Sequence, residues 1–236
     1  MSHLVISKGE FQSRRGTFPV LTLLSVMDIA AGVDHLLILT SNGHVFASAA
    51  SGHYPDKGQL GNPGLTWETR PKDRPYDTPF QVPIPGRPKV TQISAGDYHS
   101  VLLDSDGKVW AFGENAYGQL GFGYNPETPV VDVPTELTLQ SLYAEKNTTT
   151  KCTNISAGGL NSYFMVDAVE GANGSTSADV WASGNGLWGA LGNGKWTHAQ
   201  GKPTKIKKLS GLRECTNQSP HSISTKANDG RRRGSK

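Results

Sequence analysis

The chain has 236 residues, of which 36% are hydrophobic and 18% charged, a composition that suits a globular domain and excludes disorder throughout. Its 28 glycines and 14 prolines favour many short strands joined by tight turns, so we expect an all-β fold. The net charge of +3 combines a strongly basic segment, residues 201–236, with an acidic remainder. Because nucleic-acid binding requires a basic face, we do not expect the acidic part to bind nucleic acid.

Only two cysteines occur, Cys152 and Cys215, which excludes a disulfide framework and a cysteine-rich zinc site. This usage favours the cytosol, the nucleus or the mitochondrial matrix over secretion. The apolar stretch 16–27 is too short to span a bilayer, so we expect no membrane span. Its basic flank only faintly resembles a transit peptide, and we treat residues 1–25 as an N-terminal extension.

The first predicted element is a β-hairpin. Asn42-Gly43 separates the apolar runs Leu36–Leu39 and Val45–Ala47. Asparagine followed by glycine is a strong signal for a two-residue hairpin turn, because both tolerate positive φ angles. The pair Ala31-Gly32 precedes this hairpin, and the sequence Gly-Gln-Leu-Gly at 58–61 follows it.

The second predicted hairpin repeats the first. Asp106-Gly107 separates Val101–Leu103 from Val109–Phe112, with Ala95-Gly96 before the hairpin and Gly-Gln-Leu-Gly at 118–121 after it. Two hairpin signals in one register indicate an internal repeat, and a period of tens of residues is typical of solenoids and propellers.

The third copy begins at Ala157-Gly158 and ends in Gly-Ala-Leu-Gly at 189–192. Its hairpin is interrupted by Asp167–Ala178, rich in Gly, Ser and Ala, before Val180-Trp181 resumes the pattern. We predict that this insertion is an exposed loop.

Long proline-containing linkers, 62–89 and 122–151, follow the first two copies. Each contains a short β-like run, Phe80–Ile84 and Val130–Val133, suited to the outer strand of a sheet because proline is tolerated at sheet edges. Four strands per unit is the arrangement of a propeller blade. We therefore predict three four-stranded blades, about 26–89, 90–151 and 152–212, followed by a disordered basic tail, 213–236.

These copies resemble the regulator of chromosome condensation repeat: an Ala-Gly pair, a histidine three residues after the glycine, an apolar strand, a glycine turn, a Val-aromatic strand and Gly-Gln-Leu-Gly. The second copy matches nearly throughout, whereas the third has Asn161 in place of the histidine and Ala190 in place of the glutamine. The resemblance implies a β-propeller and gives a blade-building role to Gly32, His35, Gly43, Gly61, Gly96, His99, Gly107, Trp110, Gly113, Gly118, Gln119, Gly121, Gly158, Trp181, Gly184, Gly189 and Gly192.

Within this class, the linkers look like those of a fungal mitochondrial subfamily implicated in assembly of respiratory complex III. The resemblance therefore implies a non-enzymatic mitochondrial scaffold or assembly factor that binds protein partners, without cofactor, metal or small-molecule substrate. Guanine-nucleotide exchange on a small GTPase, in the nucleus or cytoplasm, is the alternative, and an enzyme-inhibitor or ligase-associated propeller is a third. A family member closes a seven-bladed ring, so three repeats suggest an arc from a fragment or truncated member, with open edges that favour association.

Several residues also allow chemical interpretations. His35 and His99 could act as ligands or bases, but no third partner recurs beside them, so we expect them to hydrogen-bond the backbone of the adjacent blade. Gly184, Gly186 and Gly189 spell the dinucleotide fingerprint, yet no helix is expected after them, which favours a blade turn. The run Arg231–Arg233 is read as a solvated terminal segment.

Trp110 and Trp181 occupy equivalent positions and are predicted to be core aromatics between blades. Other tryptophans fall in loops, where aromatic residues are often used for binding. The candidate protein-contact residues are therefore Trp67, Arg70, Arg74, Tyr76 and Trp196. Packing of Trp67 on its own loop is the competing interpretation.

Overall fold

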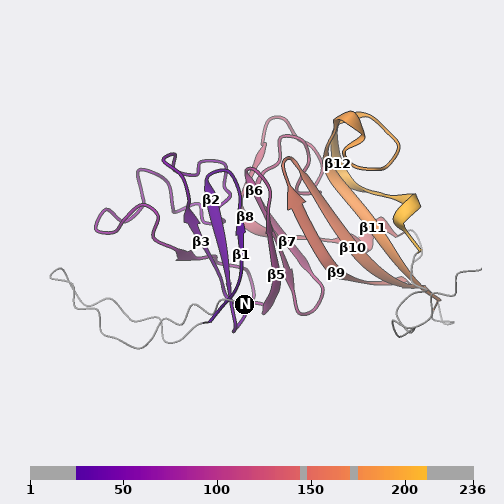
Figure 1. Ribbon diagram of the computed structural model, residues 1–236, viewed down its shortest axis with the longest axis horizontal. Coiled ribbons are helices and arrows are strands. Elements are labelled where there is room, and N and C mark those ends of the chain that lie inside the picture. The colour runs from indigo at the N-terminus through magenta and orange to yellow at the C-terminus, as the bar shows by residue number, and fades with distance from the viewer. Residues whose placement is uncertain (1–24, 144–147, 171–174, 212–236) are drawn as a thin grey trace, which may run out of the picture.

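The computed structural model describes residues 25–143, 148–170 and 175–211. In these residues the strands form three separate antiparallel sheets of four strands each. The three sheets lie next to one another in chain order (Figure 1). Each sheet is a simple up-and-down meander, so each repeat builds one blade, as predicted.

Blade 1 contains β1 (Val26–Ala31), β2 (His35–Thr40), β3 (Val45–Ala49) and β4 (Phe80–Gln81). Blade 2 contains β5 (Val90–Ala95), β6 (His99–Asp104), β7 (Val109–Glu114) and β8 (Val130–Leu137). Blade 3 contains β9 (Thr148–Gly158), β10 (Asn161–Glu170), β11 (Ser175–Gly186) and β12 (Thr197–Lys205). Three short 3₁₀ turns, Leu139–Leu142, Leu187–Gly189 and Lys207–Leu209, complete the described elements.

The hydrophobic core lies between the blades. Leu37 and Val45 of blade 1 pack with Leu102 and Phe112 of blade 2. On the opposite face of blade 2, Val101, Leu103 and Val109 pack with Phe164 and Val166 of blade 3. Because successive strand residues face opposite sides of a sheet, the neighbours Val101 and Leu102 serve different cores. All six residues of β6 are accordingly buried, and its centre, Val101–Leu103, is apolar on both faces.

The outer blades each leave one sheet face open. In β1, Met27 is 65% exposed and Ile29 is 58% exposed. In β10, Met165 and Val169 are also exposed, while the alternating residues Phe164, Val166 and Ala168 are buried. Period-two alternation of this kind is typical of a strand with only one covered face.

The predicted loop in the third copy is wrong over most of its length. Residues 167–170 pair with residues 175–178 in the extended hairpin of β10 and β11, and Asp167–Glu170 pair on their other side with Thr148–Lys151 of β9. Propensity suggested a loop, but pairing with strands on both sides overrides it. Residues 171–174, like the N-terminal extension up to residue 24 and the predicted tail, lie outside the described residues.

The outer strands also differ in length from the prediction. β4 has only two residues, and the chain leaves the ladder before Pro83, which has no backbone N–H to donate. β8 instead runs on to Leu137 and accommodates Pro134 at the sheet edge. In the part of the chain that the structure describes, no helix is both long and apolar enough to cross a membrane.

Candidate functional site

The two repeat histidines join neighbouring blades. His35 and His99 are completely buried, and their Nε2 atoms lie 3.1 Å from Ser100 Oγ and 2.9 Å from Ser162 Oγ of the next blade. The sequence predicted backbone partners in the adjacent blade. Serine hydroxyls contact both rings, and His99 in addition has a hydrogen bond with the backbone of Asn161 in blade 3. Burial lowers the pKa of His35 to about 4 and that of His99 to about 3, so both rings are neutral at pH 7. In blade 3 the equivalent residue, Asn161, has a buried Oδ1 with no hydrogen-bond partner among the described residues.

The Gly-Gln-Leu-Gly loops pack against the outer strand of the next blade. A Cβ on Gly118 would lie 2.3 Å from the Cα of Gly201 in β12, and one on Gly58 would lie 2.9 Å from the Cα of Asp132 in β8. Both glycines have positive φ angles, which side chains disfavour. Glycine is therefore required at each position for two reasons: its backbone conformation and the close approach of two blades.

Buried glutamines stabilise these loops from inside. Gln59 donates from Nε2 to Asp34 and accepts from the backbone N–H of Lys57. Gln119 accepts from the backbone N–H of Tyr117. Gln119 also donates from Nε2 to Glu114 at 3.4 Å, so both glutamines use the oxygen and the nitrogen of the amide, which accounts for a glutamine at this position.

The hairpin turns provide the opposite end of each interface. Val90 N–H donates to the carbonyl of Gly43, and Cys152 N–H donates to the carbonyl of Gly107. Each turn therefore contacts the first strand of the next blade as well as reversing its own hairpin.

The two repeat tryptophans are both 8% exposed and lie in the inter-blade cores. Trp110 Nε1 donates to Asp104 Oδ2 at 3.0 Å, and Trp181 Nε1 donates to the hydroxyl of Tyr143 at 3.0 Å. A buried indole N–H needs such a partner.

The remaining repeat glycines occupy comparable structural positions. Gly113 and Gly184 lie near the ends of the third strands, β7 and β11, with φ angles of 111° and 117°. Gly184 is in β11, and the segment after it forms the 3₁₀ turn Leu187–Gly189 followed by further turns. No long helix follows the strand, so the local structure differs from a dinucleotide-binding unit. The other repeat glycines lie in the strand-end and loop turns, at Gly32, Gly61, Gly96, Gly121, Gly158, Gly189 and Gly192.

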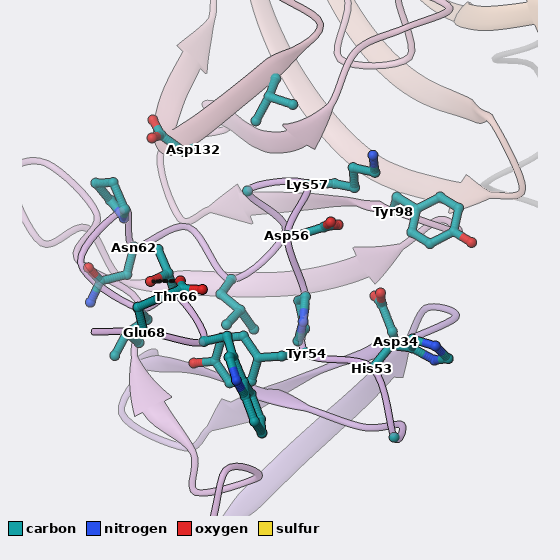
Figure 2. A pocket seen from close by; sticks show the side chains of 18 residues that line it. Asp34, His53, Tyr54, Asp56, Lys57, Asn62, Thr66, Glu68, Tyr98 and Asp132 are labelled. Atoms are coloured by element: carbon teal, nitrogen blue, oxygen red, sulfur yellow. Dashed lines mark hydrogen bonds between the residues drawn. The ribbon is translucent and has the colours of Figure 1, made fainter. Parts of the chain in front are cut away.

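A hollow with a volume of about 830 Å³ lies between blades 1 and 2. We call it the inter-blade groove. One wall comes from the long β3–β4 connection, including Tyr54, Asp56 and Trp67, and the other from Tyr98 and Asp132 of blade 2. Figure 2 shows these walls, with Asp132 on one side and Tyr54 on the other.

Trp67 is a groove residue that also belongs to the predicted contact patch. It is 53% exposed, its ring lies edge-on to Tyr54 at 6.0 Å, and the Arg70 guanidinium carbon lies 3.5 Å from its ring centroid. Arg70 and Lys72 also donate hydrogen bonds to the Trp67 carbonyl. Trp67 therefore packs on its own loop and at the same time offers an aromatic surface to solvent.

The other predicted contact residues are divided between two blades. Arg74 and Tyr76 are exposed in the same connection as Trp67. Trp196 instead belongs to blade 3, where it is 71% exposed and packs edge-on against Trp188, which is 82% exposed. Sequence reasoning missed Tyr54, Tyr98 and Asp132, because they fall outside the repeat pattern and come from different blades.

Among the described residues, the Cys152 thiol and the possible metal ligands are the remaining candidates for a chemical role. Burial raises the pKa of the Cys152 thiol to about 12, which keeps it protonated and a poor nucleophile. Among these residues no group of three or more His, Cys, Asp or Glu side chains is arranged to hold a metal ion.

Comparison with known proteins agrees with the repeat assignment. The family profile of the regulator of chromosome condensation (RCC1) repeat matches residues 55–103 and 106–165, and a second profile of this repeat matches residues 90–119. The solved structure of Prp20p from Saccharomyces cerevisiae has the same fold, with a TM-score of 0.54 at 22% identity over 77% of this chain and 38% of that one.

Two curated relatives align over most of this chain. Protein FMP25 of S. cerevisiae is 28% identical over 199 residues, which cover 77% of this chain and 33% of FMP25. RUG3 of Arabidopsis thaliana is 28% identical over 198 residues, which cover 84% of this chain and 37% of RUG3. The chain thus spans about a third of each relative, and both are named as mitochondrial, in agreement with the expected localisation. Residues 55–165 therefore carry regulator of chromosome condensation repeats, and the described residues form three adjacent blades of a β-propeller.

Proposed function

We propose that this chain is a non-enzymatic, protein-binding propeller that serves as an assembly or scaffold factor for a mitochondrial respiratory complex. The observation that carries the proposal is the inter-blade groove, where both blades contribute walls and Trp67 remains half exposed. Exposed aromatic side chains beside a hollow are typical of protein contacts. The mitochondrial relatives support the compartment, and the resemblance of the linkers points to complex III.

The repeat framework supports contact as the mode of action. His35, His99 and the buried glutamines are used to join blades and fix loops. The first linker, by contrast, carries exposed side chains such as Trp67 and Tyr76. We therefore assign partner contact to the first linker and stability to the repeat positions.

Deletion of the gene in its own host, followed by native gel separation of the respiratory complexes, tests this role. We expect less mature complex III and more of its assembly intermediates. The wild-type chain should restore the complex, Trp67→Ala should restore it incompletely, and Tyr124→Ala should restore it fully. Tyr124 is a matched control, since it is 52% exposed in the second linker. Normal complex III after deletion would contradict the proposal.

Guanine-nucleotide exchange on a small GTPase remains the second candidate, with a nuclear or cytoplasmic location. It is favoured by the shared fold with Prp20p, whose structure is described together with its binding to Gsp1p and histones. Release of a labelled nucleotide from purified small GTPases distinguishes the two. Acceleration by the purified chain would replace the assembly role with exchange.

A further inference from the structure

We propose that the inter-blade groove binds a basic, arginine-containing segment of a partner protein. This rests on the proposed protein-binding function and specifies the chemistry of the partner. Three properties of the groove carry it: its shape, its charge and the aromatic surface on its wall.

The groove is large enough for an extended peptide and is built by two blades. Its volume of about 830 Å³ lies within the usual range of ligand-binding clefts, roughly 300–1,000 Å³. Gly58 holds the two walls together, since its Cα faces Asp132 and Val130 without space for a side chain. The walls therefore belong to a rigid framework, which limits the entropy lost on binding.

The charge of the lining is negative. Asp56, Glu68 and Asp132 are exposed carboxylates along the groove, and Lys57 is the one lysine or arginine in its lining (Figure 2). A fourth carboxylate, Asp34, is buried and already accepts a hydrogen bond from Gln59. The excess of carboxylates complements a basic segment and would disfavour an acidic one.

Beyond the lining lie the cations Arg70 and Lys72 beside Trp67 and, at the other side, the carboxylates of Asp97 and Glu114. Burial raises the pKa of Glu114, and the nearby carboxylates of Asp56 and Asp97 act in the same direction, against the opposing effects of Lys57 and a hydrogen bond from Gln119. Glu114 ends β7, so carboxylates from both blades meet at this end of the groove. A partner cation placed there would relieve their repulsion.

The aromatic wall favours arginine over lysine. Trp67 already packs against two cations of its own loop, and the guanidinium makes the closer contact: the Arg70 guanidinium carbon lies 3.5 Å from the ring centroid and the Lys72 ammonium nitrogen 5.5 Å. Tyr54 and Tyr98 add two further rings to the lining. Guanidinium groups stack on aromatic faces and pair with carboxylates in a planar fork, whereas an ammonium acts as a point charge.

Fluorescence anisotropy with labelled peptides and the purified full chain tests the proposal. The probe contains three arginines separated by glycine and serine, and control peptides carry citrulline or lysine at the same places. We expect citrulline to weaken binding at least about tenfold and lysine to weaken it about threefold. Equal affinity for the citrulline peptide would overturn the proposal, and equal affinity for lysine would overturn its preference for arginine.

Variants of the groove locate the binding site. Asp56→Asn with Asp132→Asn should weaken binding about tenfold, because both carboxylates face the cation in the groove. The pair Asp28→Asn with Asp106→Asn removes the same charge from exposed positions outside the groove lining and should change binding less than about twofold. Equal losses in both pairs would show general attraction to an acidic protein and overturn the site. Thermal melting of both double variants confirms that they remain folded.

The chain also contains its own basic run, Arg231–Arg233. Replacing these three arginines with glutamine in the full chain should leave peptide affinity unchanged. Tighter peptide binding by this variant would identify the chain's own segment as the occupant and overturn the assignment to a partner. Failure of the arginine peptide to bind, together with loss of complex III on gene deletion, would reject the arginine-containing partner and keep the assembly role.

Discussion

The two inter-blade interfaces share one set of contacts but differ in what surrounds them. Each has a histidine bonded to the serine of the next blade, a turn carbonyl that accepts from the next strand, and a glycine loop against the next outer strand. The contact at Gly118 is closer than that at Gly58, and Tyr117 packs against His198 across the second interface. The first interface carries the groove instead.

The difference arises in the linkers. The connection from β3 to β4 covers residues 50–79, whereas the connection from β7 to β8 covers residues 115–129, about half that length. The longer connection supplies Tyr54, Asp56 and Trp67 to the groove. Conserving the interface contacts while changing the linker therefore adds a binding surface without altering the blade framework.

Lowering the pH should have the largest effect on folding stability, because it protonates the interface histidines His35 and His99. Their pKa values fall from 6.5 to about 4 and about 3 in the folded state, so below pH 6.5 the unfolded chain binds more protons and stability decreases. At pH 4.5 the two together should cost about 5 kcal/mol relative to pH 7, with the loss complete only below the folded pKa values. Chemical denaturation across this range measures it.

Variants assign this pH dependence to each interface. His99→Asn should remove at least as much of the slope between pH 6.5 and 4 as His35→Asn, since the folded pKa of His99 is the lower. Asparagine is a suitable replacement because it occupies the same place in blade 3, at Asn161. An unchanged slope in the double variant would show that other groups cause the acid sensitivity.

Alanine at the loop glycines should give the next largest effect. Gly118→Ala places a Cβ 2.3 Å from Gly201 Cα and should cost about 3–4 kcal/mol, while Gly58→Ala, with 2.9 Å to Asp132 Cα, should cost about 2–3 kcal/mol. Gly86→Ala is the control, since it has a φ of 72° but nothing within 4 Å, and should cost only about 1 kcal/mol. Equal losses at all three positions would attribute the effect to backbone conformation alone.

Loss of the hydrogen bonds donated by the two buried indoles should lower the free energy of unfolding by a smaller amount. Trp110→Phe leaves the buried Asp104 carboxylate without its indole donor and should cost about 2–3 kcal/mol, more than Trp181→Phe, which loses a bond to a neutral hydroxyl and should cost about 1–2 kcal/mol. Urea denaturation of both proteins checks this order. The reverse order would mean that the edge-on contact of Trp181 with Tyr143 matters more than the charged acceptor.

Substitutions in the groove should have the smallest effect on stability. Trp67→Ala removes a half-exposed ring and its contact with Arg70, which should cost about 1 kcal/mol or less. Thermal melting is the measurement. A loss as large as that of Gly118→Ala would place Trp67 in the framework and not in the contact surface.

Much of the fold could be predicted because its signals are local. Asn42-Gly43 and Asp106-Gly107 mark the two hairpins correctly, but the prediction of two-residue turns is wrong. The loops have three residues, 41–43 and 105–107, and only their glycines have a positive φ, so Leu39 pairs with Val45 and Leu103 pairs with Val109. The long hairpin of blade 3 was missed because its strands depend on pairing with β9, which composition does not reveal.

The candidate site was only partly visible in the sequence. Trp67 was found because a tryptophan in a linker is unusual, whereas Tyr98 and Asp132 are brought to the groove by the packing of blade 2 on blade 1. Such residues have no sequence spacing that links them. The two candidate tryptophans, Trp67 and Trp196, also proved to belong to different blades.

The central claim is that partner contact resides in the first linker and not in the repeat framework. Photo-crosslinking in intact mitochondria tests it most directly, with benzoylphenylalanine in place of Trp67 in one protein and of Tyr124 in another. The account predicts a discrete crosslinked partner from position 67, reduced by Asp56→Asn with Asp132→Asn, and none from position 124. Crosslinks from position 124 alone, or equal crosslinks from both positions, would contradict it.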